Sequence, residues 1–282
     1  MLSAASPHVP LPAPAAGRGE LTVTRSRDGR NAVERAYATS PLRLLTPTNH
    51  GHAAWIYTSS LGGGLVDGDH LSLDVDIGPG ASAFVSTQSA TKVFRGDSGA
   101  GTELHARIGS GGLLVCAPDP VVCFAASRYR QVQHLDLAAG SGLVLVDWLS
   151  SGRHTCGERW AFDSYRSRLC VHREGRLVLH DSLALRAADG DLALRLGRFD
   201  VLGIALVVGV PVHGHAETIV ARVAQTPVSV RADLLLAAAP LTGGGCLLRF
   251  AGTSVEQAGW TIRDYLGFVP ALLGDDPWAR KW

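Results

Sequence analysis

The stretch Leu71-Ser72-Leu73-Asp74-Val75-Asp76-Ile77 decides the fold class, because apolar and polar residues alternate through it without a break. A two-residue period is that of a β-strand with one face in the core and the other in water. Gly78-Pro79-Gly80 ends this strand, and residues 83–93 begin another extended segment. The sequence therefore predicts two consecutive strands joined by a tight turn.

Similar short runs recur along the chain, and clusters of Gly, Pro, Asp or Ser separate nearly all of them. They cover residues 104–108, 121–124, 131–137, 143–146, 169–172, 177–185, 192–196 and 245–250. Many short strands with few helical patterns are typical of a β-sandwich or a related two-layer structure. We expect a mostly β fold with two packed layers of many short, largely antiparallel strands.

Helical periodicity is found only in the C-terminal part of the chain. A weak amphipathic pattern covers residues 216–224, and a stronger one follows Gly252. In the stronger pattern Thr253 is the expected N-cap and Glu256, three residues on, completes a capping box. Its apolar face would consist of Val255, Ala258, Ile262 and Leu266. We expect about two helices in this part.

Composition restricts the domain organisation and the class of partner. Residues 1–19 are rich in Ala and Pro and lack the basic start and apolar run of a signal peptide, so we expect a disordered leader. Residues 20–282 show no linker or internal repeat and are expected to form a single domain. Lys and Arg total 26 and Asp and Glu total 25, which argues against a nucleic-acid-binding face. The most apolar stretch, residues 201–212, is shorter than the ~20 residues of a membrane-spanning helix. We expect a cytoplasmic protein without a membrane or nucleic-acid partner.

The five cysteines do not show the pattern of a disulfide framework. Their number is odd, their spacing is wide, and no Cys-x-x-Cys pair occurs. A disulfide network or a structural zinc site is therefore not expected. Reduced thiols in a cytosolic protein are the simpler interpretation.

Two phrases flank the strand at residues 71–77: Gly62-Gly63-Gly64-Leu65-Val66-Asp67-Gly68-Asp69 and Thr87-Gln88-Ser89-Ala90-Thr91-Lys92-Val93-Phe94-Arg95. The glycines allow sharp turns that could direct both aspartates to one point; the alternative is a hairpin tip with solvated carboxylates. The glycines lack the Lys-Ser/Thr of a phosphate loop. Ser89-Ala90-Thr91-Lys92 matches the Ser-x-x-Lys motif of acyl-enzymes, but its neighbours favour a strand instead of the required helix.

A second group of chemically active residues lies in residues 147–162, a stretch that begins with Asp147 and contains the phrase Gly152-Arg153-His154-Thr155-Cys156-Gly157-Glu158. Arg153 and Glu158 could form an ion pair that fixes a strand crossing, a role that is more often architectural than catalytic. Alternatively, His154, Cys156 and Glu158 alternate along an extended segment and share one face towards a passing cation.

Two His-x-His pairs, His50/His52 and His213/His215, each enclose a glycine, which suggests loops. In extended backbone both imidazoles of a pair could bind one nickel or zinc ion. A structural or incidental role is the favoured interpretation, because closed metal sites usually have three or four ligands. The alternative function that these pairs support is a metal-dependent hydrolase.

Taken together, these phrases resemble the UreD (also called UreH) family of urease accessory proteins. Two further stretches add to the resemblance: Ala117-Pro118-Asp119-Pro120-Val121-Val122-Cys123-Phe124 and Leu273-Gly274-Asp275-Asp276-Pro277-Trp278-Ala279-Arg280-Lys281-Trp282. The resemblance covers the chain from roughly Glu20 to its last residue. It implies a β-rich fold and a non-catalytic role in delivering nickel to apo-urease.

The resemblance also implies the partners and the cargo. It implies that the chain docks on the apo-urease subunits and on UreF, and that UreF recruits the nickel- and GTP-bound protein UreG. Nickel would then pass through an internal channel of this chain as transient cargo, with no tightly bound cofactor. A third interpretation is a purely structural β-domain that bridges other proteins.

A conduit has to bind nickel weakly enough to release it, which favours scattered oxygen ligands over a closed cage. The candidates for such a lining are Asp69, Ser89, Asp147 and Glu158. The motif residues expected to shape the turns around them are Gly62, Gly63, Gly64, Gly68, Gln88, Lys92, Arg95, Gly152, Arg153 and Gly157.

Overall fold

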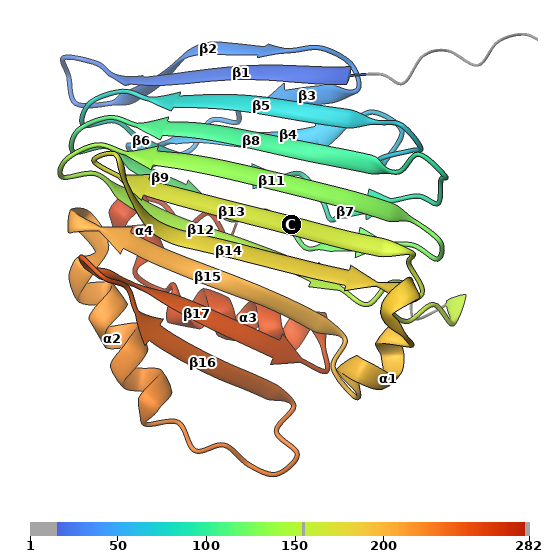
Figure 1. Ribbon diagram of the computed structural model, residues 1–282. Coiled ribbons are helices and arrows are strands. Elements are labelled where there is room, and N and C mark those ends of the chain that lie inside the picture. The colour runs from blue at the N-terminus through green and yellow to red at the C-terminus, as the bar shows by residue number, and fades with distance from the viewer. Residues whose placement is uncertain (1–15, 154–155, 280–282) are drawn as a thin grey trace, which may run out of the picture.

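The computed structural model describes residues 16–153 and 156–279, which form two β-sheets packed face to face, with helices at one end (Figure 1). The first sheet has seven strands in the order β14–β13–β11–β8–β5–β1–β2. In that order the strands cover Arg176–Arg186, Ser164–Arg173, Arg128–Leu137, Ala100–Ile108, His70–Ile77, Ala16–Arg25 and Asn31–Ala38. The two-layer, mostly β expectation is confirmed.

The second sheet has ten strands, eight of them in the order β16–β17–β15–β12–β9–β6–β4–β3. These eight cover Leu234–Pro240, Gly245–Gly252, Val201–Gly209, Gly142–Ser150, Leu113–Cys116, Ser82–Thr87, Ala54–Ser60 and Leu42–Leu45. The remaining two are β10 (Val121–Cys123), which pairs with β12, and β7 (Thr91–Val93), which pairs with β10.

The expectation of largely antiparallel strands is wrong, because the interior of both sheets is parallel. β8 pairs in parallel with both β5 and β11, and β9 pairs in parallel with both β6 and β12. The cause is the path of the chain, which alternates between the sheets: β5, β8 and β11 belong to the first, and β6, β9 and β12 to the second. Neighbours within one sheet are therefore not hairpin partners, and they run in the same direction.

The apolar faces that the alternating pattern predicts meet between the sheets. Val75 and Ile77 of β5 pack with Val85 of β6, Leu135 of β11 and Leu145 of β12, all buried. A second apolar layer fills the space between the other face of the ten-stranded sheet and the helices. A third cluster at one end of the sheets contains the buried aromatic side chains Tyr129, Trp160, Phe162 and Tyr165.

The C-terminal helices α2 (His213–Ala224), α3 (Val255–Tyr265) and the short α4 (Val269–Leu273) pack on the ten-stranded sheet (Figure 1). The helices expected at residues 216–224 and after Gly252 are thus confirmed. The expected cap is wrong by one residue: Ser254, not Thr253, accepts a hydrogen bond from the backbone N–H of Gln257, at 3.3 Å.

Two other local predictions differ from the structure. Residues 192–196 form the helix α1 (Leu192–Leu196) instead of a strand, because the Asp191 carboxylate caps the backbone N–H groups of Ala193 and Leu194. β1 begins at Ala16, so residues 16–19 of the predicted leader pair with β5. The rest of that leader lies outside the described residues. Within the described ranges no helix has the length and apolarity needed to span a membrane.

Candidate functional site

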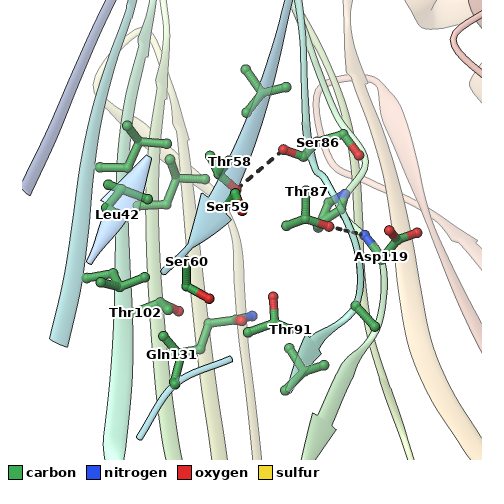
Figure 2. Close-up of a pocket in the computed structure, with 18 of the residues that line it drawn as sticks. Leu42, Thr58, Ser59, Ser60, Ser86, Thr87, Thr91, Thr102, Asp119 and Gln131 are labelled. Atoms are coloured by element: carbon green, nitrogen blue, oxygen red, sulfur yellow. Dashed lines mark hydrogen bonds between the residues drawn. The ribbon is translucent and has the colours of Figure 1, made fainter. Parts of the chain in front are cut away.

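A cavity of about 530 Å³ lies between the two sheets, at the end where β4, β6 and β7 face β8 and β11 (Figure 2). One part of its wall is apolar, with Leu42, Leu65 and Leu71. The rest is rich in hydroxyl and amide groups: Thr58, Ser59, Ser60, Ser86, Thr87, Gln88, Ser89, Thr91, Thr102, Gln131 and Gln133. Neutral oxygen donors of this kind bind a cation weakly and leave it able to move.

Buried polar side chains reach this cavity because the strand alternation places them there. Gln131 and Gln133 occupy the inward positions of β11, between Tyr129 and Leu135, and both are buried. On the opposite sheet Ser86 donates a 2.7 Å hydrogen bond to the carbonyl of Ala117. The inner part of the polar lining is therefore built into the strands, whereas Gln88 and Ser89 come from the segment between β6 and β7.

Asp147 on β12 is the acidic centre of this polar lining. Its Oδ2 accepts hydrogen bonds from Gln131 Nε2 at 2.8 Å, Gln133 Nε2 at 3.1 Å and Ser167 Oγ at 3.1 Å. Burial raises the pKa of this carboxyl, the hydrogen bonds oppose that rise, and the negative charge of Asp181 adds to it. A cation beside Asp147 would relieve the cost of burying the carboxylate.

A second cavity, of about 570 Å³, lies on the other side of Asp147. It is bounded by β13 and β14 on one sheet and by β15, β16 and β17 on the other, and its charged residues are Asp147, Asp181 and Arg249. The Arg249 guanidinium donates to the Asp181 carboxylate across the gap between the sheets. Since Asp147 lines both cavities, its carboxylate stands at their junction.

Three acids that border these cavities were missed from sequence: Glu103, Asp119 and Asp181. Asp119, buried between Pro118 and Pro120, lines the first cavity, and its backbone N–H donates to the Thr87 hydroxyl oxygen at 2.8 Å. Asp181 occupies an inward position of β14, in phase with Leu179 and Leu183. The position of Asp181 in an alternating apolar run is the sequence signal for this site, because a carboxylate at that position faces the space between the layers.

The structure brings together only two of the four predicted nickel-path residues. Ser89 lies at the exposed side of the first cavity and Asp147 at its inner end. Asp69 closes its own turn, where its Oδ2 accepts a hydrogen bond from the backbone N–H of Val66 at 2.9 Å. Glu158 accepts a hydrogen bond from the N–H of Ala125 at 3.1 Å and pairs with Arg153. Neither Asp69 nor Glu158 belongs to the lining of the described cavities.

The glycines of the first phrase have distinct structural tasks. Gly62, Gly63 and Gly68 have φ angles of 88°, 75° and 83°, which side chains rarely adopt. Gly64 instead lies against the next phrase: a Cβ there would be 2.7 Å from the carbonyl oxygen of Lys92. This close approach aligns Leu65, whose N–H donates to that carbonyl at 2.8 Å.

Most side chains of the second phrase, residues 87–95, do not take part in the contact between Gly64 and the Lys92 carbonyl. Gln88 and Ser89 are exposed at the cavity rim, and the side chains of Lys92 and Arg95 are exposed to solvent. Ser89 and Lys92 do not lie on a helix, so the Ser-x-x-Lys resemblance has no structural support. Asp67 accepts hydrogen bonds from the N–H groups of Ser98 and Gly99, so its carboxylate stabilises a turn, a role that neither interpretation of this phrase predicted.

The predicted Arg153–Glu158 ion pair is present. Arg153 Nε donates to Glu158 Oε2 at 3.0 Å, and the guanidinium lies 4.1 Å from the centre of the Phe124 ring. Gly152, with a φ of 127°, and Gly157, with a φ of 72°, provide the bends on either side. The alternative was a shared face of His154, Cys156 and Glu158. His154 lies outside the described residues, and Cys156 is exposed.

Replacing Glu158 with Ala is expected to lower the stability of the chain by roughly 1–2 kcal/mol at neutral pH, since Arg153 and the Ala125 N–H both lose their acceptor. The hydrogen bond from Arg153 lowers the pKa of Glu158, so this contribution is present above the ordinary glutamate pKa and lost as the pH falls below it. Thermal unfolding at pH 7 and in acid measures both effects. Reduced urease activation without any change in unfolding would instead return Glu158 to the nickel path.

The first His-x-His pair, His50 and His52, is exposed in the loop that precedes β4. His213 and His215 lie on α2, where residues two apart point in different directions. His213 faces Glu217 at 3.4 Å, whereas His215 stacks on Phe268 with 4.1 Å between ring centres. In the part of the chain that the structure describes, no three His, Cys, Asp or Glu side chains converge on a common point.

These features define the class of the protein: a two-sheet β protein with internal cavities that combine apolar walls with hydroxyl, amide and carboxylate groups. The family model described as UreD urease accessory protein matches residues 15–282. The chain is 51% identical to a urease accessory protein UreD of Sorangium cellulosum, over 95% of this chain and 85% of that protein. It is 43% identical to one of Anaeromyxobacter sp. (99% and 96%) and 32% identical to urease accessory protein D of Arabidopsis thaliana (89% and 96%).

The chain belongs to the UreD family of urease accessory proteins. It is a non-catalytic chaperone of urease maturation that functions within the urease accessory complex. The family assignment confirms the resemblance seen in the sequence and removes the metal-dependent hydrolase as an alternative.

Proposed function

We propose that this chain binds apo-urease together with UreF and UreG, in the cytoplasm, and conducts nickel to the urease active site during maturation. Nickel is transient cargo here, and no tightly bound cofactor is required. The family assignment supports the role in maturation, and the internal cavities support the conduction of a cation.

The observation that carries this proposal is the position of Asp147. Its partly buried carboxylate borders both cavities, which together extend from the exposed Ser89 to Arg249, itself half-exposed. A cation that moves between the sheets meets hydroxyl and amide oxygens first and a carboxylate at the junction. Asp119 and Asp181 provide further negative charge on the two sides.

The chemistry of this lining suits a conduit better than a storage site. Carboxylate, hydroxyl and amide oxygens are hard ligands, whereas nickel held permanently in proteins is usually bound by imidazole or thiolate groups as well. Cys116, which also borders the first cavity, is kept in its thiol form because burial raises its pKa to about 12. The thiol is a weak ligand, so nickel would remain free to move on.

Co-expression of the urease subunits and the other accessory proteins, with and without this chain, tests the proposed function. We expect nickel-loaded, active urease only when the chain is present. The nickel content of purified urease, measured beside its activity, separates a failure of nickel delivery from a failure of urease assembly. Equal nickel content and activity without the chain would contradict the proposal.

A further inference from the structure

The outer face of the seven-stranded sheet carries an unusual concentration of histidine. The chain has 11 histidines. Strand alternation directs five of them to this one face, away from the cavities: His70, His105, His134, His172 and His180. None of these belongs to the His-x-His pairs, and the proposed nickel path does not use them.

Strand register aligns several of these side chains into one row across the sheet. His105 of β8 is paired with Asp74 of β5 on one side and with His134 of β11 on the other. His134 is in turn paired with Cys170 of β13, and Cys170 with His180 of β14. Paired positions on neighbouring strands are about 5 Å apart and point to the same side. Five consecutive strands thus each contribute a side chain that can bind a metal ion.

The centre of the row is already compact. The rings of His105 and His134 stack with 5.3 Å between their centres and 11° between their planes. The Glu103 carboxylate, two residues before His105 on the same face, lies 4.0 Å from His105 Nε2 and 3.5 Å from His70 Nε2. Nitrogen and oxygen ligands of one ion lie about 2.0–2.2 Å from it and so roughly 3 Å from each other.

Metal binding by this cluster would require its side chains to rotate. The described residues hold no group of three ligands that converges as it stands. However, the side chains of His105 and Glu103 are 48% and 32% exposed, so they can change rotamer without displacing the core. The backbone positions, which rotation cannot supply, are fixed by the parallel pairing of β8 with β11.

We propose that Glu103, His105 and His134 form a surface site for a borderline divalent cation such as zinc or nickel. The Cys170 thiol, next to His134, is available as a fourth ligand. Imidazole nitrogens favour these ions over magnesium or calcium, and one carboxylate reduces the charge of the complex. Asp74 adds negative charge beside His105, while Arg168 of β13, opposite Val132 on this face, limits the affinity.

This site goes beyond the proposed conduction of nickel, because it lies on the other side of the strands that line the cavity. Thr102 and Gln133 of β8 and β11 face inwards, whereas His105 and His134 face outwards and do not border the cavity. Glu103 has an outward position on β8 but also borders the cavity. Replacing His105 and His134 therefore leaves the residues that line the cavity in place, and replacing Asp147 leaves the surface site intact.

Isothermal titration of the purified full chain with zinc chloride, and separately with nickel chloride, tests the proposal. We expect one saturable site that the double variant His105→Ala/His134→Ala weakens at least tenfold. The matched control His50→Ala/His52→Ala removes the same number of imidazoles elsewhere and should bind as the unaltered chain does. Circular dichroism checks the fold of each variant, and His105→Gln/His134→Gln replaces the alanine variant if that variant does not fold.

Binding that is unchanged in a folded His105/His134 variant would overturn the proposal, as would binding lost in the His50/His52 control. Absence of saturable binding in the unaltered chain would also overturn it. Repeating the titration with the Asp147→Asn variant should give the unaltered isotherm. This last result distinguishes the surface site from the cavity, so that each proposal can fail independently of the other.

Discussion

Replacing Asp147 with Asn is expected to reduce the activation of co-expressed urease about tenfold or more, without reducing the amount of folded chain. Asparagine has nearly the same shape, but it has no negative charge to offer a cation at the junction of the two cavities. A lost interaction of about 1.4 kcal/mol corresponds to a factor of ten, and interactions with a buried charge commonly exceed this value.

The same substitution is expected to stabilise the chain. Because burial raises the pKa of Asp147, the folded state binds a proton more tightly than the unfolded state does. The free energy of unfolding then falls as the pH rises from the ordinary aspartate pKa of about 3.9 through the raised value. The free energy of unfolding of the Asn variant does not fall in this way. At pH 7 the variant should therefore be more stable than the unaltered chain by on the order of 1 kcal/mol for each unit by which the pKa is raised.

Urea unfolding at pH 4 and pH 7, together with urease activity and nickel content, measures both effects. Asp136, an exposed aspartate on the outer face of β11, provides a matched control as Asp136→Asn and should change neither quantity much. An Asp147→Asn variant that is both less stable and less active would indicate a structural role only. Full activation would remove Asp147 from the nickel path.

The second large effect concerns stability alone: Gly209→Ala is expected to destabilise the chain by at least roughly 3 kcal/mol. Gly209 ends β15 with a φ of 107°, and a Cβ there would lie 2.1 Å from the carbonyl oxygen of Ser141. The obstacle is backbone on the neighbouring strand, where Gly142 pairs with Gly209, so no side chain can move aside.

Gly214→Ala, five residues further on, is the matched control and should have the opposite sign. Gly214 lies on α2, and nothing lies within 4 Å of a Cβ added there. Alanine is favoured over glycine on a helix, so a gain of up to about 1 kcal/mol is expected. Urea unfolding measures the stability of the two variants. Equal changes in the free energy of unfolding would show that the close approach of Gly209 to Ser141 is not the reason why glycine is needed at position 209.

Much of the fold could be predicted from the sequence, because strand alternation is a local signal. The buried face of β5 and the start of β17 at Gly245 follow directly from it. The pairing of strands could not be predicted, since it depends on which sheet each successive strand joins. Residues 192–196 were assigned to a strand because a single capping carboxylate, that of Asp191, was not recognised.

The candidate site could be predicted only in part, for a related reason. Asp147 and Ser89 were found through the phrases that contain them, and both border the cavity. Asp69 and Glu158 belong to equally distinctive phrases, yet the structure uses their carboxylates to bind backbone N–H groups. A carboxylate that stabilises a turn and one that faces a cavity look the same in a sequence, because the difference lies in distant strands. Asp181, whose charge acts on Asp147, comes from such a distant strand.

The alternation of the chain between the two sheets has a consequence for folding kinetics. His70 of β5 is paired with Gly101 of β8, and Gly101 with Arg130 of β11. Between each two of these neighbouring strands of the first sheet, the chain first forms strands of the second sheet. Such a topology has a high contact order, which slows folding and leaves unpaired strand edges exposed during synthesis. Because strands of the two sheets alternate along the chain, we expect the two layers to fold as one cooperative unit. We therefore expect the yield of soluble chain to depend on low expression temperature and on partners that are present while it folds.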